Sequence, residues 1–589
     1  MRSGVVLLAG VSALLLGGAF RLVQLERTQG SRLRERAERQ HTATWTIPAQ
    51  RGEILDCRGR VLAGTIRRPS VFVDPTLVSD VEAAARAVAG ALGLEARKLE
   101  RLIREHVDRS FVWVKRELSD AELERFNRVR REERLQGFVV RYEPKRVYPY
   151  GRMAAQVLGF VGAEHRGLAG IEQSFDDYLR GEDGQGCSTV DARRRRVRTE
   201  PDGYRMPRDG ATVVLTIDTH VQQRAEYHLR NAVQEFKPQW ASAVVMDPLS
   251  GEVLAMATLP DFDPADPIPS GLKPAAQAAA TELLRNRVVA DAYEPGSIFK
   301  PFIAAPALDA GLVQMDEAFA INGPTRSFGS RTIHDVHAYG TLTFHEIISK
   351  SSNIGMGLVG ARCGNGRLYE FVRRFGFGER TGIELPGEHT GLVLDLADWG
   401  RYSTQSVPIG QEIAATPIQI LSAFCVFCND GVLYRPRIVR GVVNAAGETV
   451  VDHSTPVVVR RVLSAETARE FRLRALVEVV TTGTGTRAQL PDYQVFGKTG
   501  TAQVARSSGR GYIPGAYVSS FVGGAPADQP RVAVLVSLYR PAGGAYYGGT
   551  VAAPTAAAIM ADALAYMQVP PQPPAGGRER GSGAPLRVR

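Results

Sequence analysis

The sequence predicts a membrane-anchored α/β (α+β) protein with at least two domains, and three features indicate this class. A chain of 589 residues has room for more than one hydrophobic core. Residues 5–20 form an almost purely apolar run. Late in the chain, the stretch around Lys498 and residues 517–521 and 532–538 have the spacing of successive antiparallel strands, and a helical pattern over 552–567 closes the domain.

The composition is that of a folded protein with a moderately basic surface. Hydrophobic residues make up 44% and charged residues 23%, with a formal net charge of +10. No zinc-ligand spacing or aromatic-basic RNA motif accompanies this charge, so we expect no nucleic-acid partner. An anionic membrane surface or an anionic lipid-linked substrate fits the charge at least as well. The arginine run at 193–196 is interpreted as a solvated loop.

The cysteines indicate neither a disulfide framework nor a metal site. Five of them cannot all pair within one chain: Cys57, Cys187, Cys363, Cys425 and Cys428. The last two have C-x-x-C spacing, but they lie at an apolar run, 418–427, without a second pair or a nearby histidine. We predict core packing for them, and we expect no metal and no cofactor. Cysteine usage does not settle the compartment.

The N-terminal apolar run predicts a transmembrane anchor over residues 4–25. A cleaved signal peptide is the alternative, with Arg2 as its basic segment, but no clear small-residue cleavage site follows. Residues 26–45 alternate in charge along a helical pattern and predict a stalk helix. More arginines follow the span than precede it, so charge counting alone would leave the C-terminus inside the cell.

Residues 46–205 read as a mixed module without a catalytic constellation. We expect a strand at 71–73, helical structure over 81–107, extended structure at 141–150 and mixed structure at 153–161. Arg51, Glu53 and Asp56 are interpreted as an interdomain ion-pair network rather than as catalytic carboxylates.

Residues 206–568 read as the larger domain. A strand at 212–217 is followed by a helix to about Phe236, which Asp218 or Thr219 can cap. Residues 241–246 and 252–257 predict a hairpin. Ser464 is a plausible N-cap for a helix to about Val480, after which 481–486 predict a flexible loop near the site. The polar, Pro-rich tail 569–589 predicts disorder.

The stretch Glu294-Pro295-Gly296-Ser297-Ile298-Phe299-Lys300 carries the strongest chemical signal. A serine hydroxyl needs a base to become a nucleophile, and residues at i and i+3 are neighbours on one helix face. The Pro-Gly pair predicts a helix start, so Ser297 would lie in the first turn, where the dipole favours developing negative charge. Lys300 can act as a base only if burial or a second cation lowers its pKa. The apolar run after Lys300 places this helix in the core, with Ser297 at the base of a cleft.

Two later stretches complete a serine acyl-transfer site. They are Ser351-Ser352-Asn353, which follows a helical pattern, and Lys498-Thr499-Gly500-Thr501, which follows an extended run. Lys498 could be the second cation. Ser351 would relay a proton, Asn353 would bind a substrate amide, and Gly500 would let an extended substrate lie close to its strand.

The ordered set of three motifs is far more specific than any one of them. The alternative is a purely structural role, in which Ser297 begins a helix and the two lysines are surface charges. His334 and His337 invite a Ser-His triad interpretation, but no Gly-x-Ser-x-Gly elbow surrounds Ser297, and Asp247 and Asp335 are likewise poor triad candidates. We therefore assign no catalytic role to the histidines.

The chain resembles class B penicillin-binding proteins, monofunctional peptidoglycan D,D-transpeptidases, and most of all their cell-division type. S-x-x-K, S-x-N and K-T-G in this order carry the resemblance. It extends over nearly the whole chain through further stretches, namely Arg51-Gly52-Glu53-Ile54-Leu55-Asp56 with Gly59 and Leu62-Ala63, Gly170-Ile171-Glu172, Leu215-Thr216-Ile217-Asp218, Ile409-Gly410-Gln411 and Thr416-Pro417-Ile418-Gln419. One departure is Asp56-Cys57-Arg58-Gly59, where the family usually has Asp-Arg-Asn-Gly.

The resemblance implies a five-stranded antiparallel sheet between helices, a pedestal (dimerisation-type) module over 46–205, and an extracytoplasmic catalytic domain anchored by one span in the inner (cytoplasmic) membrane. It implies Ser297, Lys300, Ser351, Asn353 and Lys498 as catalytic residues and Thr499, Gly500 and Thr501 as substrate-binding residues, with the oxyanion hole from the backbone N–H groups of Ser297 and Thr501. The implied partners are stem peptides, lipid-linked precursor, β-lactams, a membrane-embedded glycan polymerase and divisome proteins.

Other functions stay open at the level of sequence. An elongation-type transpeptidase would carry the same motifs. A D,D-carboxypeptidase or β-lactamase would use water as the second nucleophile, although the anchor and N-terminal module argue against a secreted β-lactamase. A non-catalytic penicillin-binding scaffold need not keep Ser351, Asn353 and Lys498 together. No glycosyltransferase domain fits before residue 206.

Overall fold

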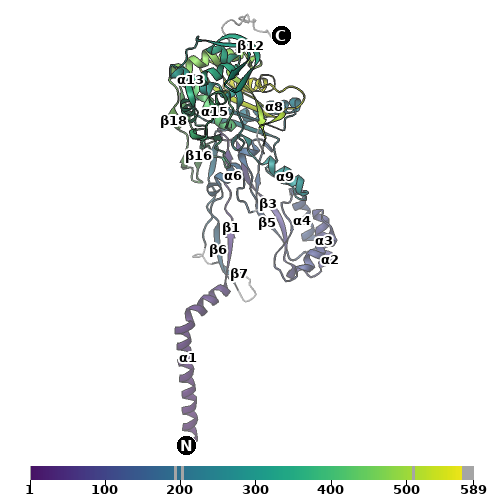
Figure 1. The fold of residues 1–589 in the computed structure, drawn as a ribbon. Coiled ribbons are helices and arrows are strands. Elements are labelled where there is room, and N and C mark those ends of the chain that lie inside the picture. The colour runs from purple at the N-terminus through teal and green to yellow at the C-terminus, as the bar shows by residue number, and fades with distance from the viewer. Residues whose placement is uncertain (1, 163, 191–195, 200–203, 507–510, 573–589) are drawn as a thin grey trace. The chain divides into compact units, whose positions relative to one another are not determined.

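The computed structural model (Figure 1) describes all residues except 1, 163, 191–195, 200–203, 507–510 and 573–589. It contains two compact units. One combines Met1–Gly52 with Arg180–Ala211, and the other combines Glu53–Leu179 with Thr212–Arg589. Most of the arginine run at 193–196, and the tail from 573, lie outside the described residues.

The first unit holds the predicted anchor. Helix α1, Arg2–His41, contains an apolar segment, Gly4–Thr28, with a mean hydropathy of 2.1, which is long and apolar enough to cross a membrane once. No break separates this segment from the expected stalk, because the same helix continues to His41. The Thr- and Ile-containing stretch β1, Thr42–Ile47, is then extended, as β-branched residues favour. It pairs with β6, Gly184–Val190, and β6 pairs with β7, Arg196–Thr199.

In the second unit, a mixed sheet has the strand order β17-β16-β8-β2-β3-β4, with β5 also pairing with β3. Its strands are β2 Ile54–Leu55, β3 Val61–Val73, β4 Val112–Lys115, β5 Phe138–Val147, β8 Thr212–Leu215, β16 Val439–Val443 and β17 Thr449–Asp452. Strands β2 and β8 are parallel, and the other pairs are antiparallel. The boundary expected near residue 205 therefore does not separate two sheets.

Three helices pack against β3, β4 and β5 and form what we call the head. They are α2 Val81–Leu92, α3 Ala96–Glu105 and α4 Asp120–Glu132, and Figure 1 shows them gathered beside β3 and β5. The helical structure expected over 81–107 is two helices, because Gly93 adopts a left-handed conformation at the C-cap of α2. Apolar side chains such as Val88, Leu99 and Phe126 form the head's core.

The catalytic region is built on an antiparallel sheet of five strands in the order β10-β9-β21-β20-β19. The strands are β9 Trp240–Met246, β10 Val253–Leu259, β19 Phe496–Ala505, β20 Tyr512–Ala525 and β21 Val532–Tyr539. This confirms the predicted fold class, the hairpin at 241–257 and the late antiparallel strands. Strand β19, which carries Lys498, lies at the edge of the sheet.

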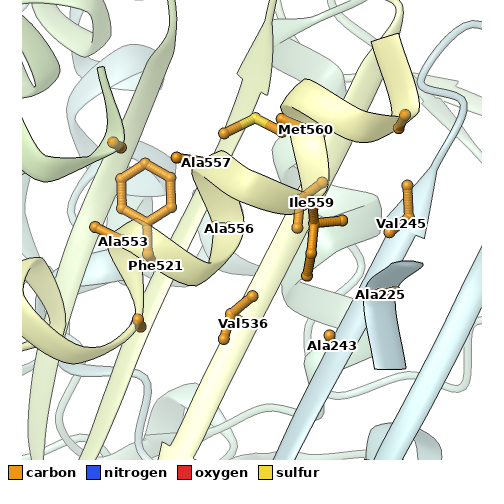
Figure 2. Packing of buried hydrophobic residues seen from close by; sticks show 14 of the residues in the cluster. Ala225, Ala243, Val245, Phe521, Val536, Ala553, Ala556, Ala557, Ile559 and Met560 are labelled. Carbon is orange, nitrogen blue, oxygen red and sulfur yellow. The ribbon is translucent and has the colours of Figure 1, made fainter. Parts of the chain in front are cut away.

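Helices cover both faces of this sheet. On one face, α8 Thr219–Phe236 and α19 Ala553–Tyr566 pack against the strands. Figure 2 shows Ala556, Ile559 and Met560 of α19 among side chains of β9, β20 and β21. Helix α15, Pro417–Phe424, packs from the other side, where Cys425 contacts Met246. Cys425 and Cys428 are buried, as predicted.

Local signals placed several other elements correctly. Asp218 caps α8 by accepting from His220 N, and Ser464 caps α16, Ala465–Glu470. A π-helical turn, Phe471–Leu476, joins α16 to α17, Val477–Thr481. The expected flexible loop is instead held by backbone hydrogen bonds, including Thr484 N to Ser349 O. The start of the expected tail is also packed, since Val569 is buried and accepts from the Tyr493 hydroxyl.

Candidate active site

Ser297 lies on a 3₁₀ turn, Gly296–Phe299, directly before helix α11, Pro301–Asp309. The first turn of an α-helix was expected here. Pro301 lacks the N–H that would complete the α-helical bond to Ser297 O, and Lys300 N bonds that oxygen instead at 3.4 Å. Ser297 is partly exposed, whereas Lys300 is fully buried. The turn thus presents the hydroxyl at the surface and directs the lysine inward.

The buried Lys300 ammonium group reaches the second motif. Its Nζ donates to Ser351 Oγ at 3.0 Å, to Asn353 Oδ1 at 2.8 Å and to Ser351 O at 2.5 Å. Burial lowers the pKa of Lys300 to about 7, while the negative charge of Asp335 opposes this shift. A lysine with this pKa is about half neutral at pH 7, so it can act as a base there. Burial was one of the two causes that the sequence suggested.

Lys498 approaches the same serine from β19. Its Nζ donates to Ser351 Oγ at 3.0 Å and to Thr499 O at 3.2 Å. Burial, reinforced by the nearby charge of Lys300, holds the pKa of Lys498 well below its usual range. Two lysines from distant parts of the sequence therefore meet at one hydroxyl, and their mutual repulsion disfavours holding both charges at once.

Ser351 lies at the junction between α12, Phe344–Ser349, and α13, Asn353–Arg374. Its φ of +60° is uncommon for a residue with a side chain. The neighbouring Ser352 caps α13 by accepting from Gly355 N at 2.9 Å. A serine in a sparsely populated backbone conformation, between two lysines, is typical of a functional site.

Asp335 is the main site residue that the sequence reasoning missed. It lies on β12, Arg331–Thr343, which pairs with β11, Ala318–Phe328. One carboxylate oxygen accepts from Asn353 N and Ile354 N, and the other accepts from Ser352 Oγ. Asp335 thus fixes the start of α13 from a separate element. The sequence analysis considered Asp335 only as a poor triad candidate, and no local pattern indicated its contact with α13.

Neither histidine forms that triad. Asn353 Nδ2 donates to the backbone oxygen of His334 at 2.9 Å, and the His337 ring lies near Tyr339. Within the described residues, no hydrogen bond joins either histidine to Ser297, and no group of three or more His, Cys, Asp or Glu side chains could hold a metal ion.

The K-T-G-T stretch lies along the edge strand β19. Thr499 bonds Thr484 with 2.6 Å between the hydroxyl oxygens, and Thr501 Oγ1 accepts from Gly548 N at 3.1 Å. A Cβ at Gly500 would lie 2.8 Å from Ile298 Cγ2, next to Ser297. A side chain at this position would therefore clash, because β19 approaches the nucleophile turn closely. Contact of Gly500 with substrate stays a prediction.

Of the residues expected to form an interdomain ion-pair network, Asp56 does belong to one, together with partners that were not predicted. Asp56 accepts from Arg60 Nε at 2.6 Å and from Thr219 Oγ1 at 2.6 Å, while Asp218 pairs with Arg58 and Arg60. The network links the turn after β2 to the start of α8. Cys57, the departure from the family pattern, lies beside it, and burial raises the pKa of its thiol to about 11.

This fold and site define a penicillin-recognising serine enzyme, and comparisons with known proteins agree. Residues 241–561 match the penicillin-binding protein transpeptidase domain, and residues 46–215 match the penicillin-binding protein dimerisation domain. The chain belongs to the class B penicillin-binding protein transpeptidase family.

Similar proteins include stage V sporulation protein D of Bacillus subtilis, 34% identical over 96% of this chain and 86% of that protein. Peptidoglycan D,D-transpeptidase FtsI of Escherichia coli is 30% identical over 89% of this chain and 85% of its own length. Among solved structures, penicillin-binding protein 3 of Mycobacterium tuberculosis, complexed with aztreonam, superposes with a TM-score of 0.68 at 29% identity, covering 90% of this chain and 99% of that one.

Proposed function

We propose that this protein is a peptidoglycan D,D-transpeptidase that cross-links stem peptides through an acyl-enzyme on Ser297. The observation that carries the proposal is the meeting of Lys300 and Lys498 at Ser351 Oγ, beside the turn that exposes Ser297. Membership of a family whose members are named D,D-transpeptidases supports the same reaction.

In the first step, Ser297 Oγ attacks the carbonyl carbon of the penultimate D-Ala of a stem pentapeptide. Neutral Lys300 accepts the hydroxyl proton, which its lowered pKa permits. The backbone N–H groups of Ser297 and Thr501 stabilise the oxyanion. As the carbon–nitrogen bond breaks, Ser351 passes a proton, shared with the two lysines, to the departing D-Ala amine.

In the second step, an amine of a neighbouring stem attacks the ester, the cross-link forms, and Ser297 recovers its proton. Lys498, Thr499 and Thr501 bind the terminal carboxylate of the donor, and Asn353 binds a donor amide. β-Lactams resemble the D-Ala-D-Ala end and acylate the same serine. The related M. tuberculosis protein was solved with aztreonam and with ampicillin.

The cellular role that we propose is septal cell-wall synthesis, which the likeness to FtsI supports. Helix α1 anchors the chain in the inner membrane, and the catalytic domain faces the extracytoplasmic side, where the substrate lies. The module over 46–205 holds the catalytic domain away from the membrane. Glycan polymerisation then comes from a membrane-embedded partner, and divisome proteins position both.

The reaction is tested with purified full-length protein, a stem pentapeptide donor and a D-amino acid acceptor, followed by mass spectrometry. We expect a stem peptide in which the acceptor D-amino acid has replaced the terminal D-Ala, and we expect no such product from Ser297→Ala. If the only product at every acceptor concentration were the tetrapeptide formed by hydrolysis of the donor, the protein would be a D,D-carboxypeptidase, and transpeptidation would be contradicted.

A further inference from the structure

The segment that leads to Ser297 is built against the stretch Ile409-Gly410-Gln411, which has no role in the mechanism above. Tyr293 and Ala415 exchange backbone hydrogen bonds of 3.1 and 3.0 Å, and Gly296 N donates to Gly410 O at 3.1 Å. A Cβ at Gly410 would lie 2.2 Å from Gly296 O, so the two backbones are in direct contact. The position of the nucleophile turn therefore depends on this neighbouring segment.

The side chain of Glu294 extends this contact to a third segment. Its Oε1 accepts from Glu412 N at 3.0 Å, and its Oε2 accepts from the Tyr512 hydroxyl at 2.8 Å. Tyr512 is the first residue of β20 and lies opposite Ala505 at the far end of β19. One carboxylate, three residues before Ser297, thus joins the nucleophile turn to the 409–412 segment and to the strand pair that carries the K-T-G-T stretch.

The 409–412 segment is itself fixed from β12. Arg331 donates to Gln411 Oε1 at 3.0 Å and to Ser406 Oγ, and it lies 3.7 Å from the Glu412 carboxylate. Glu412 also accepts from Ser403 Oγ at 2.6 Å. Because Arg331 and Ser403 hold this segment as well, the bond from Glu412 N to Glu294 ties the nucleophile turn to a restrained support.

Glu294 is placed to position groups rather than to react. Each carboxylate oxygen already accepts a hydrogen bond, and neither bond involves Ser297. Burial, with the nearby Glu412 charge, raises the pKa of Glu294, which marks a desolvated group. A partly buried acceptor with both oxygens engaged favours one geometry, since losing either bond leaves a partly desolvated polar group.

We propose that Glu294 is a positioning residue that sets the Ser297 hydroxyl relative to Lys300 and to β19, through its bonds to Glu412 N and to Tyr512. The inference rests on the proposed function, because acylation of Ser297 is the step that it serves. Small displacements of a reacting group can slow a reaction greatly without weakening binding.

The test is rapid-mixing acylation with a fluorescent penicillin over a range of concentrations, which separates the acylation rate constant from the dissociation constant of the initial complex. We expect Glu294→Ala to lower the rate constant by about 10- to 100-fold, with the dissociation constant within about threefold of wild type. Glu294→Gln should stay within about threefold in both, because an amide can accept from Glu412 N and donate to Tyr512. Tyr512→Phe, which loses one bond, should fall between them.

The matched control is Glu235→Gln, an exposed carboxylate near the end of α8, which should behave as wild type. A merely structural role would lower the melting temperature of Glu294→Ala while its rate constant at 25 °C stayed at the wild-type value, and that result overturns the proposal. The proposal is also overturned if Glu294→Gln acylates as slowly as Glu294→Ala, because the negative charge, and not the hydrogen bonds, would then be essential. If Glu294→Ala does not fold, an unchanged rate in Tyr512→Phe overturns it. Wild-type protein that is not acylated at all contradicts the proposed function instead.

Discussion

The head and the catalytic region are each packed on a sheet, but they bury different kinds of side chain. The head's core cluster is apolar, and ion pairs such as Arg86–Glu82 lie on its surface. The catalytic region buries two lysines, Lys300 and Lys498, completely. Burying a cation costs free energy, and the protein compensates with hydrogen bonds that converge on Ser351. The buried side chains of the head stabilise its fold, whereas the buried lysines of the catalytic region are explained by the reaction that they serve.

The largest effect should follow from removing a buried lysine. Lys300→Met keeps the bulk of the side chain but removes the base, so we expect the acylation rate to fall by about 100- to 10,000-fold. Stopped-flow acylation by a fluorescent penicillin measures this. Lys98→Met, an exposed lysine of the head, is the control and should acylate normally. Equal acylation rates for the two variants would show that the buried lysine has no special role in acylation.

The second test is the pH dependence of acylation. Neutral Lys300 is the active form, and burial lowers its pKa to about 7. The rate should therefore rise about tenfold per pH unit below this value and level off above it. Between the folded pKa and the usual lysine value the unfolded chain binds more protons, so this group's contribution to stability increases as pH rises through that window. A rate that is flat from pH 5 to pH 9 would exclude Lys300 as the base.

A smaller effect should follow from Asp335→Asn, because this carboxylate holds the start of α13 and does not itself react. The acylation rate should fall by about tenfold as the start of α13 loosens. The negative charge of Asp335 raises the Lys300 pKa, so its removal should shift the pH–rate midpoint downward. An upward shift would show that Asp335 acts on the base in another way.

The smallest effect on acylation should come from the head. Leu99→Ala removes buried apolar volume from α3 and should destabilise the head by about 2–5 kcal/mol. Hydrogen exchange in peptides of 81–105 should accelerate, while the acylation rate stays at the wild-type value. A parallel loss of acylation would mean that the core of the head determines the geometry of the catalytic site.

Much of the site could be predicted because its chemistry is written in local motifs. Spacing alone placed Ser297 and Lys300 on one turn, and strand patterning placed Lys498 on one of the late antiparallel strands. The capping residues Asp218 and Ser464 were also predictable, since a cap depends only on its near neighbours.

The remaining features depend on contacts between distant segments. Asp335 fixes Asn353 from another element, and β2 pairs with β8 across more than 150 positions of sequence. No local pattern encodes such pairings. The 3₁₀ turn at Ser297 was a different case, because Pro301 has no N–H to continue the α-helical hydrogen bonds, and this is visible in the sequence. The apolar run after Pro301 suggested one continuous helix, so the turn was not predicted.

The proposed function depends on acylation of Ser297, with two buried lysines moving its protons. Intact-protein mass spectrometry after exposure to a fluorescent penicillin tests it directly, with wild type compared with Ser297→Ala. We expect one stable adduct on the wild type and none on the variant. Folded wild-type protein without an adduct, or an adduct that persists in Ser297→Ala, would contradict it.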